Sequence, residues 1–216
     1  MACCCRKSEI ILKGCTCMQK REQRKIYVES IRERLSAQRF AHCLGVEKAA
    51  LALAQQYGES EERASTAALL HDYAKELPKS HLLDLAKQYR IEIDDVYADS
   101  PGLLHGPVAA CLVKEKFHIT DELILKAIRN HTVGAASMST LEKIIYLADM
   151  IEETRDFCGI NIIREAARNS LDEGMYMALT RTIAYTMERR LMVHPDSIEA
   201  YNDLLRQQKE NGHEAV

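Results

Sequence analysis

The sequence has no tryptophan, only three phenylalanines and four prolines, and no run of about 20 apolar residues such as a membrane-spanning helix requires. Without such a run, no segment is predicted to cross a membrane. Scarce proline with abundant alanine and leucine is instead typical of a helical globular protein. The length of 216 residues favours one domain, because two full domains would be cramped.

An excess of positive charge is also absent. Lysine and arginine number 29 against 32 aspartates and glutamates, which gives a formal net charge of -3. The overall charge therefore gives no support to nucleic-acid binding, and a polyanionic substrate would need metals or a few local cations. The N-terminus lacks the apolar core of a secretory signal, because Arg6, Lys7, Glu9 and Lys13 interrupt it. We expect a cytoplasmic protein whose partner is a small molecule, with no nucleic acid and no membrane.

The eight cysteines have no spacing that indicates a disulfide framework. Five of them fall within the first 17 residues: Cys3, Cys4, Cys5, Cys15 and Cys17. The last two are close together, but no second pair follows, so a zinc site is disfavoured. We predict that residues 1–17 are a disordered leader ahead of a start at Met18, and that the folded domain spans residues 18–210.

From Gln19 onward the sequence predicts consecutive helices and no convincing strand, so the expected fold class is all-α, in a single domain. Apolar residues from Phe40 to Tyr57 recur at helical spacing, and Gly58 suits a stop. A second helix is expected over 61–77, closed by Pro78. Further helices are expected at 79–90, after Gly106 and Pro107, at 121–131 with Thr120 as cap, at 141–153 and 172–191 behind Ser139 and Ser170, and after Pro195. The apolar face at 175–187 fits either the core or a homodimer contact, and the core is the commoner outcome.

The stretch TAALLHDYAKELP places His71 and Asp72 directly after an apolar run, where desolvating both is costly unless something pairs them. Four more residues have similar settings, near helix ends or after apolar runs: His42, His105, His131 and Asp149. A helical histidine taken singly is more often a core or surface residue than a ligand. His81, His118 and His213 have polar or irregular surroundings and are predicted to lie at the surface.

Taken together, four imidazoles and two carboxylates are ligand types that suit divalent iron, manganese, cobalt, nickel or zinc. Six protein ligands exceed what one catalytic metal with an open position uses, whereas two metals bridged by one carboxylate would use them all. Asp72 is the natural bridge, because its neighbour His71 fixes it at the site. The sequence therefore predicts a centre of two metals.

The order His, His-Asp, His, His, Asp is similar to that of the HD superfamily of metal-dependent phosphohydrolases. The stretches at 39–46, AALLHDYAKELP, LLHGPVAA, AIRNHTVG, LEKIIYLADMIEETRDF and HPDSIEAYN resemble, in order and spacing, the YqeK-type symmetrical diadenosine-tetraphosphate hydrolases. The resemblance runs from about Met18 to Leu205. It implies an all-helical HD fold, a di-iron centre, and hydrolysis of diadenosine tetraphosphate to two ADP. Ala41 and Cys43 depart from the polar pair that this family usually has beside His42, which leaves open how that imidazole is supported but does not affect its expected role as a ligand.

As a hypothesis, one metal is held by His42, His71, Asp72 and Asp149, and the other by Asp72, His105 and His131. Iron is expected first, with manganese, cobalt or nickel as alternatives. Besides Asp72, two cations are expected to take part in catalysis by contacting phosphate. Lys75 follows His71 by one helical turn, and Arg155 lies near a helix end with a guanidinium suited to bidentate contact. Lys143 fits a phosphate contact or a solvated surface charge equally well.

Three other functions compete with this hypothesis. The same ligands support other nucleotidases, cyclic-nucleotide phosphodiesterases or an iron oxygenase, because a metal site does not encode its substrate. A regulatory HD module that binds a nucleotide without turnover belongs to a different class, and a complete ligand set with nearby cations argues against it. A structural helical adaptor would leave six buried ionisable groups without a metal, which is costly.

Overall fold

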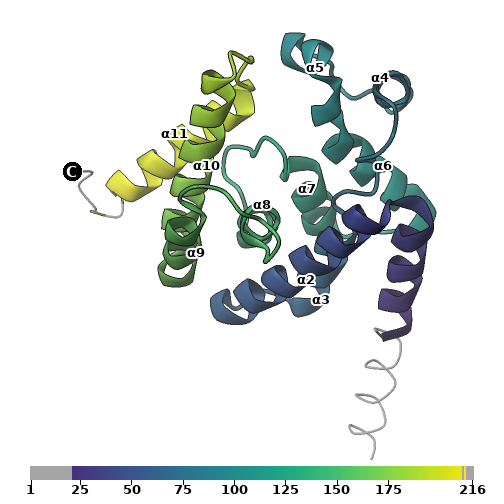
Figure 1. The fold of residues 1–216 in the computed structure, drawn as a ribbon, viewed down its shortest axis with the longest axis horizontal. Helices are drawn as coiled ribbons and strands as arrows, with labels where there is room; N and C mark the ends of the chain where they lie inside the picture. Colours follow the sequence, from purple (N-terminus) through teal and green to yellow (C-terminus); the bar gives the residue numbers. More distant parts are fainter. Residues whose placement is uncertain (1–20, 211, 213–216) are drawn as a thin grey trace, which may run out of the picture.

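Capping side chains mark where several helices begin in this protein. The computed structural model describes residues 21–210 and residue 212, and within these residues it contains no strand (Figure 1). Ser36, Ser60, Asp121 and Ser139 each accept a hydrogen bond from a backbone N–H in the first turn of their helix. Residues 21–34 are helical. The elements that follow are α2 (Ala37–Tyr57), α3 (Glu61–Leu70), α4 (Lys79–Gln88), α5 (Asp95–Asp99), the 3₁₀ helix η1 (Pro101–Leu104), α6 (His105–Phe117), α7 (Glu122–Asn130), α8 (Thr140–Ile151), α9 (Ile160–Asn169), α10 (Leu171–Glu188) and α11 (Pro195–Glu210).

The core lies where α2, α3, α6, α7 and α8 meet. α2 packs on α3 and α8, while α7 packs on α3, α6 and α8. Leu70, Ile128 and Ile144 are fully buried between these helices, and burying each such side chain stabilises the fold by roughly 1.5–3 kcal/mol. α10 covers α8 and, together with α9 and α11, forms a second group of helices on that side (Figure 1).

The predicted all-α fold class is confirmed, as are two of the predicted helix boundaries. α2 ends at Tyr57, and Gly58 caps it with φ of 69°, a left-handed conformation that glycine adopts without strain. Ser139 and Glu142 form the predicted capping box at the start of α8, with both reciprocal hydrogen bonds present.

Two predictions about helices were wrong, and two helices were missed. α3 ends at Leu70 and not at Leu77, because the next backbone hydrogen bonds, such as Lys75 N–H to the Asp72 carbonyl at 2.9 Å, span three residues instead of four. Asp121 caps α7 in place of Thr120, since its carboxylate accepts from the Leu123 N–H. The helices α5 and α9 were not predicted.

The remaining expectations concern the chain's ends and its exposed apolar side chains. The predicted leader, residues 1–17, lies outside the described residues. No helix in the described part of the chain is long and apolar enough to cross a membrane. On α10, Met175 and Leu179 are buried, whereas Tyr185 and Met187 are 45% and 64% exposed. The apolar face at 175–187 therefore divides between core and surface.

Candidate metal centre

The four histidines and two aspartates singled out in the sequence converge where α2, α3, α6, α7 and α8 meet. α2 carries His42, the turn after α3 carries His71 and Asp72, α6 begins with His105, His131 follows α7, and α8 carries Asp149. Their ligand atoms form three overlapping groups, each within 4.8 Å: His42 with His71 and Asp72, Asp72 with His105 and His131, and His71 with His131 and Asp149. All six candidate ligands thus belong to one cluster.

Asp72 lies at the middle of the cluster and divides its oxygens between two pairs of histidines. Oδ1 is 3.1 Å from His105 Nε2 and 3.6 Å from His131 Nε2. Oδ2 is 3.3 Å from His71 Nε2 and 3.7 Å from His42 Nε2. A carboxylate whose two oxygens face different ligand pairs has the arrangement needed to bridge two cations.

Backbone carbonyls fix the rings of three of these histidines. Nδ1 of His71 donates to the carbonyl of Ala68 at 2.6 Å. His105 and His131 donate in the same way to the carbonyl three residues earlier, at 2.6 and 2.7 Å. With the proton on Nδ1, the lone pair of each ring is on Nε2, and Nε2 faces Asp72. This is how metal-binding histidines are commonly oriented.

The buried nitrogens of His42 and His71 also fit a metal. Nε2 of each is buried and has no hydrogen-bond partner among the described residues, which is unfavourable unless a ligand meets it. His42 Nε2 is 3.0 Å from Asp149 Oδ1, about the separation of two ligands on one metal with bonds of about 2.1 Å. Imidazole nitrogens with carboxylate oxygens form a donor set suited to divalent transition metals.

The ionisation of the cluster favours a cation. Burial raises the pKa of the Asp72 carboxyl, but the neighbouring imidazoles of His71, His105 and His131 outweigh it and hold that pKa well below its usual value. Burial lowers the pKa of His105 to about 4. Burial also lowers the pKa of His71, yet the charges of Asp72 and Asp149 raise it overall. The cluster therefore combines an ionised bridging carboxylate with a field that attracts positive charge.

Glu152 supports His42 and was not found by sequence reasoning. Its Oε1 is 3.1 Å from His42 Nδ1, and the residue is only 1% exposed. The Thr154 N–H and hydroxyl donate to the two carboxylate oxygens at 2.7 and 2.5 Å. The support of His42 that the departure at Ala41 and Cys43 left open is therefore present, and it comes from the residue directly after α8 and not from residues beside His42. The available signal was the spacing, since Glu152 follows Asp149 by about one helical turn.

Arg164 holds the segment after α8 in place. Arg164 on α9 donates to the carbonyls of Ile151, Glu152 and Arg155 at 3.0, 2.9 and 3.0 Å. The Ile151 and Glu152 carbonyls lie at the end of α8, where no further helical turn supplies N–H donors, and the Arg155 carbonyl lies in the segment that follows. Gly45 on α2 faces the same segment, and a Cβ at Gly45 would lie 2.8 Å from Glu152 Oε2. Glu152 is therefore held both by α9 and by close contact with α2.

Arg39 contacts the cluster directly and was also missed as a site residue. Its Nη1 donates to Asp72 Oδ2 at 2.8 Å, and its side chain is 27% exposed. On α2, Arg39 lies three residues before His42, so both side chains lie on one face of the helix. The family-like stretch at 39–46 contains this arginine, but nothing in the local sequence indicates that it reaches Asp72.

Of the three cations predicted to bind phosphate, Lys75 and Arg155 lie at the cluster and Lys143 does not. Lys75 Nζ is 3.3 Å from His105 Nε2, although Lys75 lies in a turn and not one turn along a helix as predicted. Arg155 Nη2 donates to Asp149 Oδ1 at 2.6 Å. Lys143 donates instead to Asp172 at 2.6 Å and is not part of the cavity lining.

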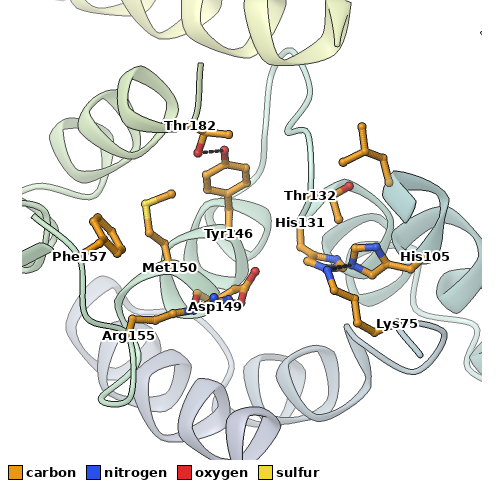
Figure 2. A pocket seen from close by; sticks show the side chains of 11 residues that line it. Lys75, His105, His131, Thr132, Tyr146, Asp149, Met150, Arg155, Phe157 and Thr182 are labelled. Atoms are coloured by element: carbon orange, nitrogen blue, oxygen red, sulfur yellow. Dashed lines mark hydrogen bonds and ion pairs between the residues drawn. The ribbon is translucent and has the colours of Figure 1, made fainter. Parts of the chain in front are cut away.

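An open cavity of about 280 Å³ adjoins the cluster. Lys75, His105 and His131 line one side, and Asp149 and Arg155 line the other (Figure 2). Apolar and hydroxyl side chains complete the lining: Leu103, Thr132, Tyr146, Met150, Phe157 and Thr182. A phosphate chain lying across this cavity would meet a cation on each side of the candidate ligands.

We expect Gly106→Ala to disturb this centre. A Cβ at Gly106 would lie 2.7 Å from the Arg129 carbonyl oxygen and 3.4 Å from His131 Cε1, so α6 and α7 would have to separate. The free energy of unfolding should fall by about 1–3 kcal/mol in a urea titration. Gly102→Ala is the control, because apart from its chain neighbours no atom of the described residues lies within 4 Å of its added Cβ. Equal stability of the two variants would contradict the expected close packing.

Comparison with known proteins relates this cluster to a family. The HD domain model matches residues 39–154, which include all six candidate ligands. A protein of Halalkalibacterium halodurans named symmetrical bis(5'-nucleosyl)-tetraphosphatase is 37% identical over 182 residues, covering 84% of this chain and 97% of that protein. A Bacillus subtilis protein of the same name is 35% identical over 175 residues, covering 81% and 94%.

A solved structure is similar over the same part of the chain. A crystal structure from Clostridium acetobutylicum, described as a predicted HD superfamily hydrolase involved in NAD metabolism, matches with a TM-score of 0.82 and 36% identity. It covers 85% of this chain and 97% of that one. The chain therefore belongs to the HD domain family, in its YqeK-type branch.

Proposed function

We propose that this protein hydrolyses diadenosine tetraphosphate symmetrically to two ADP at a centre of two divalent metals. The observation that carries this proposal is the division of the Asp72 oxygens between two histidine pairs, at 3.1 and 3.6 Å on one side and 3.3 and 3.7 Å on the other. The names of the two bacterial relatives supply the substrate class and the regiochemistry. Iron is our first choice of metal, with manganese, cobalt or nickel as alternatives.

The six ligands would bind the metals as predicted: His42, His71, Asp72 and Asp149 one, and Asp72, His105 and His131 the other. When bound, such metals lower the pKa of a water and polarise the phosphoryl oxygen under attack. Glu152 and the backbone carbonyls keep the imidazoles in the binding orientation. The catalytic domain, on this proposal, is residues 18–210.

The two cations of the cavity would neutralise and position the phosphates. Lys75 stands beside His105 and Arg155 beside Asp149, so they flank the cluster on opposite sides. A water oxygen forms a bond to one of the two central phosphorus atoms while the bond from that phosphorus to the central bridging oxygen breaks. Each product is then ADP. Because phosphoryl transfer depends mainly on positioning and charge, these contacts would supply much of the catalysis.

Product identity tests the proposal. Purified metal-loaded protein should convert diadenosine tetraphosphate to ADP as the sole nucleotide product, as measured by anion-exchange chromatography. In water enriched with oxygen-18, the label should enter one of every two ADP molecules, on its terminal phosphate. A mixture of ATP and AMP would reject symmetrical cleavage. Absence of any product, with tight nucleotide binding, would favour the non-catalytic regulatory module.

A panel of nucleotides separates the proposal from its enzymatic competitors. Faster turnover of a nucleoside monophosphate or a cyclic nucleotide than of diadenosine tetraphosphate would identify a nucleotidase or a phosphodiesterase instead. A cytoplasmic location, the absence of nucleic-acid and membrane partners, and the option of a homodimer stay predictions.

A further inference from the structure

A second cavity continues from the cavity at the metal centre. It has a volume of about 120 Å³ and shares Leu103, Thr132 and Thr182 with the first cavity. In Figure 2, Thr182 lies on the far side of the first cavity from Lys75 and Arg155. None of the six candidate ligands lines the second cavity. It therefore adjoins the reacting centre without overlapping it.

Apolar side chains make up half of the twelve residues that line this second cavity, which we call the apolar slot: Leu103, Val133, Ile183, Leu191, Met192 and Val193. Leu191 and Met192 are 47% and 45% exposed. Exposed apolar surface beside a catalytic cavity is unfavourable in water and is typical of a binding site for an apolar group. A ligand that enters the slot would contact both side chains.

Two unpaired polar atoms also belong to residues of the slot. Thr132 Oγ1 and His194 Nε2 are buried and have no hydrogen-bond partner among the described residues. His194 Nδ1 accepts from the Asp196 N–H at 3.1 Å, so Nε2 carries the proton of the neutral ring. That atom is 3.4 Å from Asp94 Oδ2 without hydrogen-bond geometry. The other two unpaired atoms of this kind belong to His42 and His71, the candidate ligands.

Resting on the proposed function, we infer that the apolar slot binds one adenine base of the substrate. Two phosphates and a ribose separate each base from the central bond, so a base subsite must adjoin the metal centre without overlapping it. Adenine has two apolar faces, which suit the aliphatic walls, and a polar edge. The Thr132 hydroxyl can donate to a ring nitrogen or accept from the amino group.

Binding of ADP and of pyrophosphate to the metal-loaded protein tests this inference. Both ligands carry two phosphates, but only ADP has a base, so the slot should make wild type bind ADP more tightly than pyrophosphate. The double variant Leu191→Ser/Met192→Ser removes two exposed apolar side chains without adding charge. We expect its affinity for ADP, measured by calorimetry, to fall about tenfold, while its affinity for pyrophosphate stays unchanged.

Met187→Ser is the matched control, because Met187 is also exposed on this part of the molecule but does not line the slot. It should leave both affinities unchanged. The inference is overturned if wild type binds ADP no more tightly than pyrophosphate, or if the double variant weakens both ligands equally or neither. Sedimentation provides a further check, since a wild-type dimer that the double variant converts to monomer would make these residues a contact between copies of the chain.

The outcome is separable from that of the proposed function, because these affinities are measured without turnover. If the wild type releases ADP from diadenosine tetraphosphate but the double variant does not change the affinity for ADP, the proposed function holds and the proposed adenine site is wrong. If the protein cleaves no dinucleoside tetraphosphate but the double variant lowers the affinity for ADP and not for pyrophosphate, the adenine site is supported and the proposed function is wrong.

Discussion

Asp72→Asn is expected to remove activity and metal binding together. The change keeps the shape of the side chain but removes its charge and replaces one oxygen with an NH₂ group, which cannot ligate a metal. Both oxygens of Asp72 face histidine pairs, so either orientation of the amide disables one side of the proposed bridge. Bound metals supply several kcal/mol of transition-state stabilisation, so kcat/KM should fall by about 10³-fold or more.

The measurements are turnover of diadenosine tetraphosphate and elemental analysis of protein purified without oxygen. The variant should lose about one metal ion per chain or more, while its circular dichroism stays helical. Asp84→Asn on α4 is the control, because Asp84 is an exposed carboxylate. Unchanged metal content in Asp72→Asn, or a wild-type protein with less than about one metal per chain, would contradict the metal centre.

The cluster was predictable from the sequence because its members carry strong local signals. His71 and Asp72 follow one buried apolar run and Asp149 follows another, so the sequence indicates that all three lie against the core. His71 and Asp72 are buried, and the Asp149 side chain is 24% exposed. The order of the six residues then identified the family. The local path of the chain was harder to predict, as Lys75 shows. Lys75 was expected one turn after His71 on a continuous helix. That helix, α3, ends at Leu70, so Lys75 lies in a turn, and from there its Nζ reaches His105.

Residues that act across the fold could not be predicted in this way. Glu152 and His42 are 110 positions apart, and they meet only because α8 packs on α2. Arg39 reaches Asp72 across the contact between α2 and the turn after α3. Sequence periodicity places a side chain on a face of its own helix, but which helix packs against that face depends on the tertiary structure. The apolar slot could not be predicted for the same reason, because its walls come from several separate segments of the chain.

Glu152→Gln is expected to weaken one metal and to spare the other. The Glu152 carboxylate accepts from His42 Nδ1 at 3.1 Å and from the Thr154 N–H and hydroxyl at 2.7 and 2.5 Å. An amide would turn its NH₂ group toward one of these donors, so a buried contact would be lost whichever way it points. His42 would then be less well oriented. Loss of such a supporting partner typically weakens metal affinity by about 10–100-fold.

A metal titration with a competing chelator measures this effect, because two metals with different ligands give two affinities. Only the affinity of the metal held by His42 should fall, since the His105 and His131 rings are fixed by backbone carbonyls and do not contact Glu152. Glu153→Gln is the matched control. The Glu153 carboxylate, next to Glu152 in the chain, is exposed and pairs with Lys48 at the surface, so this variant should keep both metal affinities at the wild-type values. Equal weakening of both metals in Glu152→Gln would mean that this residue supports the fold of the whole centre. The proposed specific support of His42 would then be wrong, because a residue that acts through one ligand can weaken only the metal which that ligand binds.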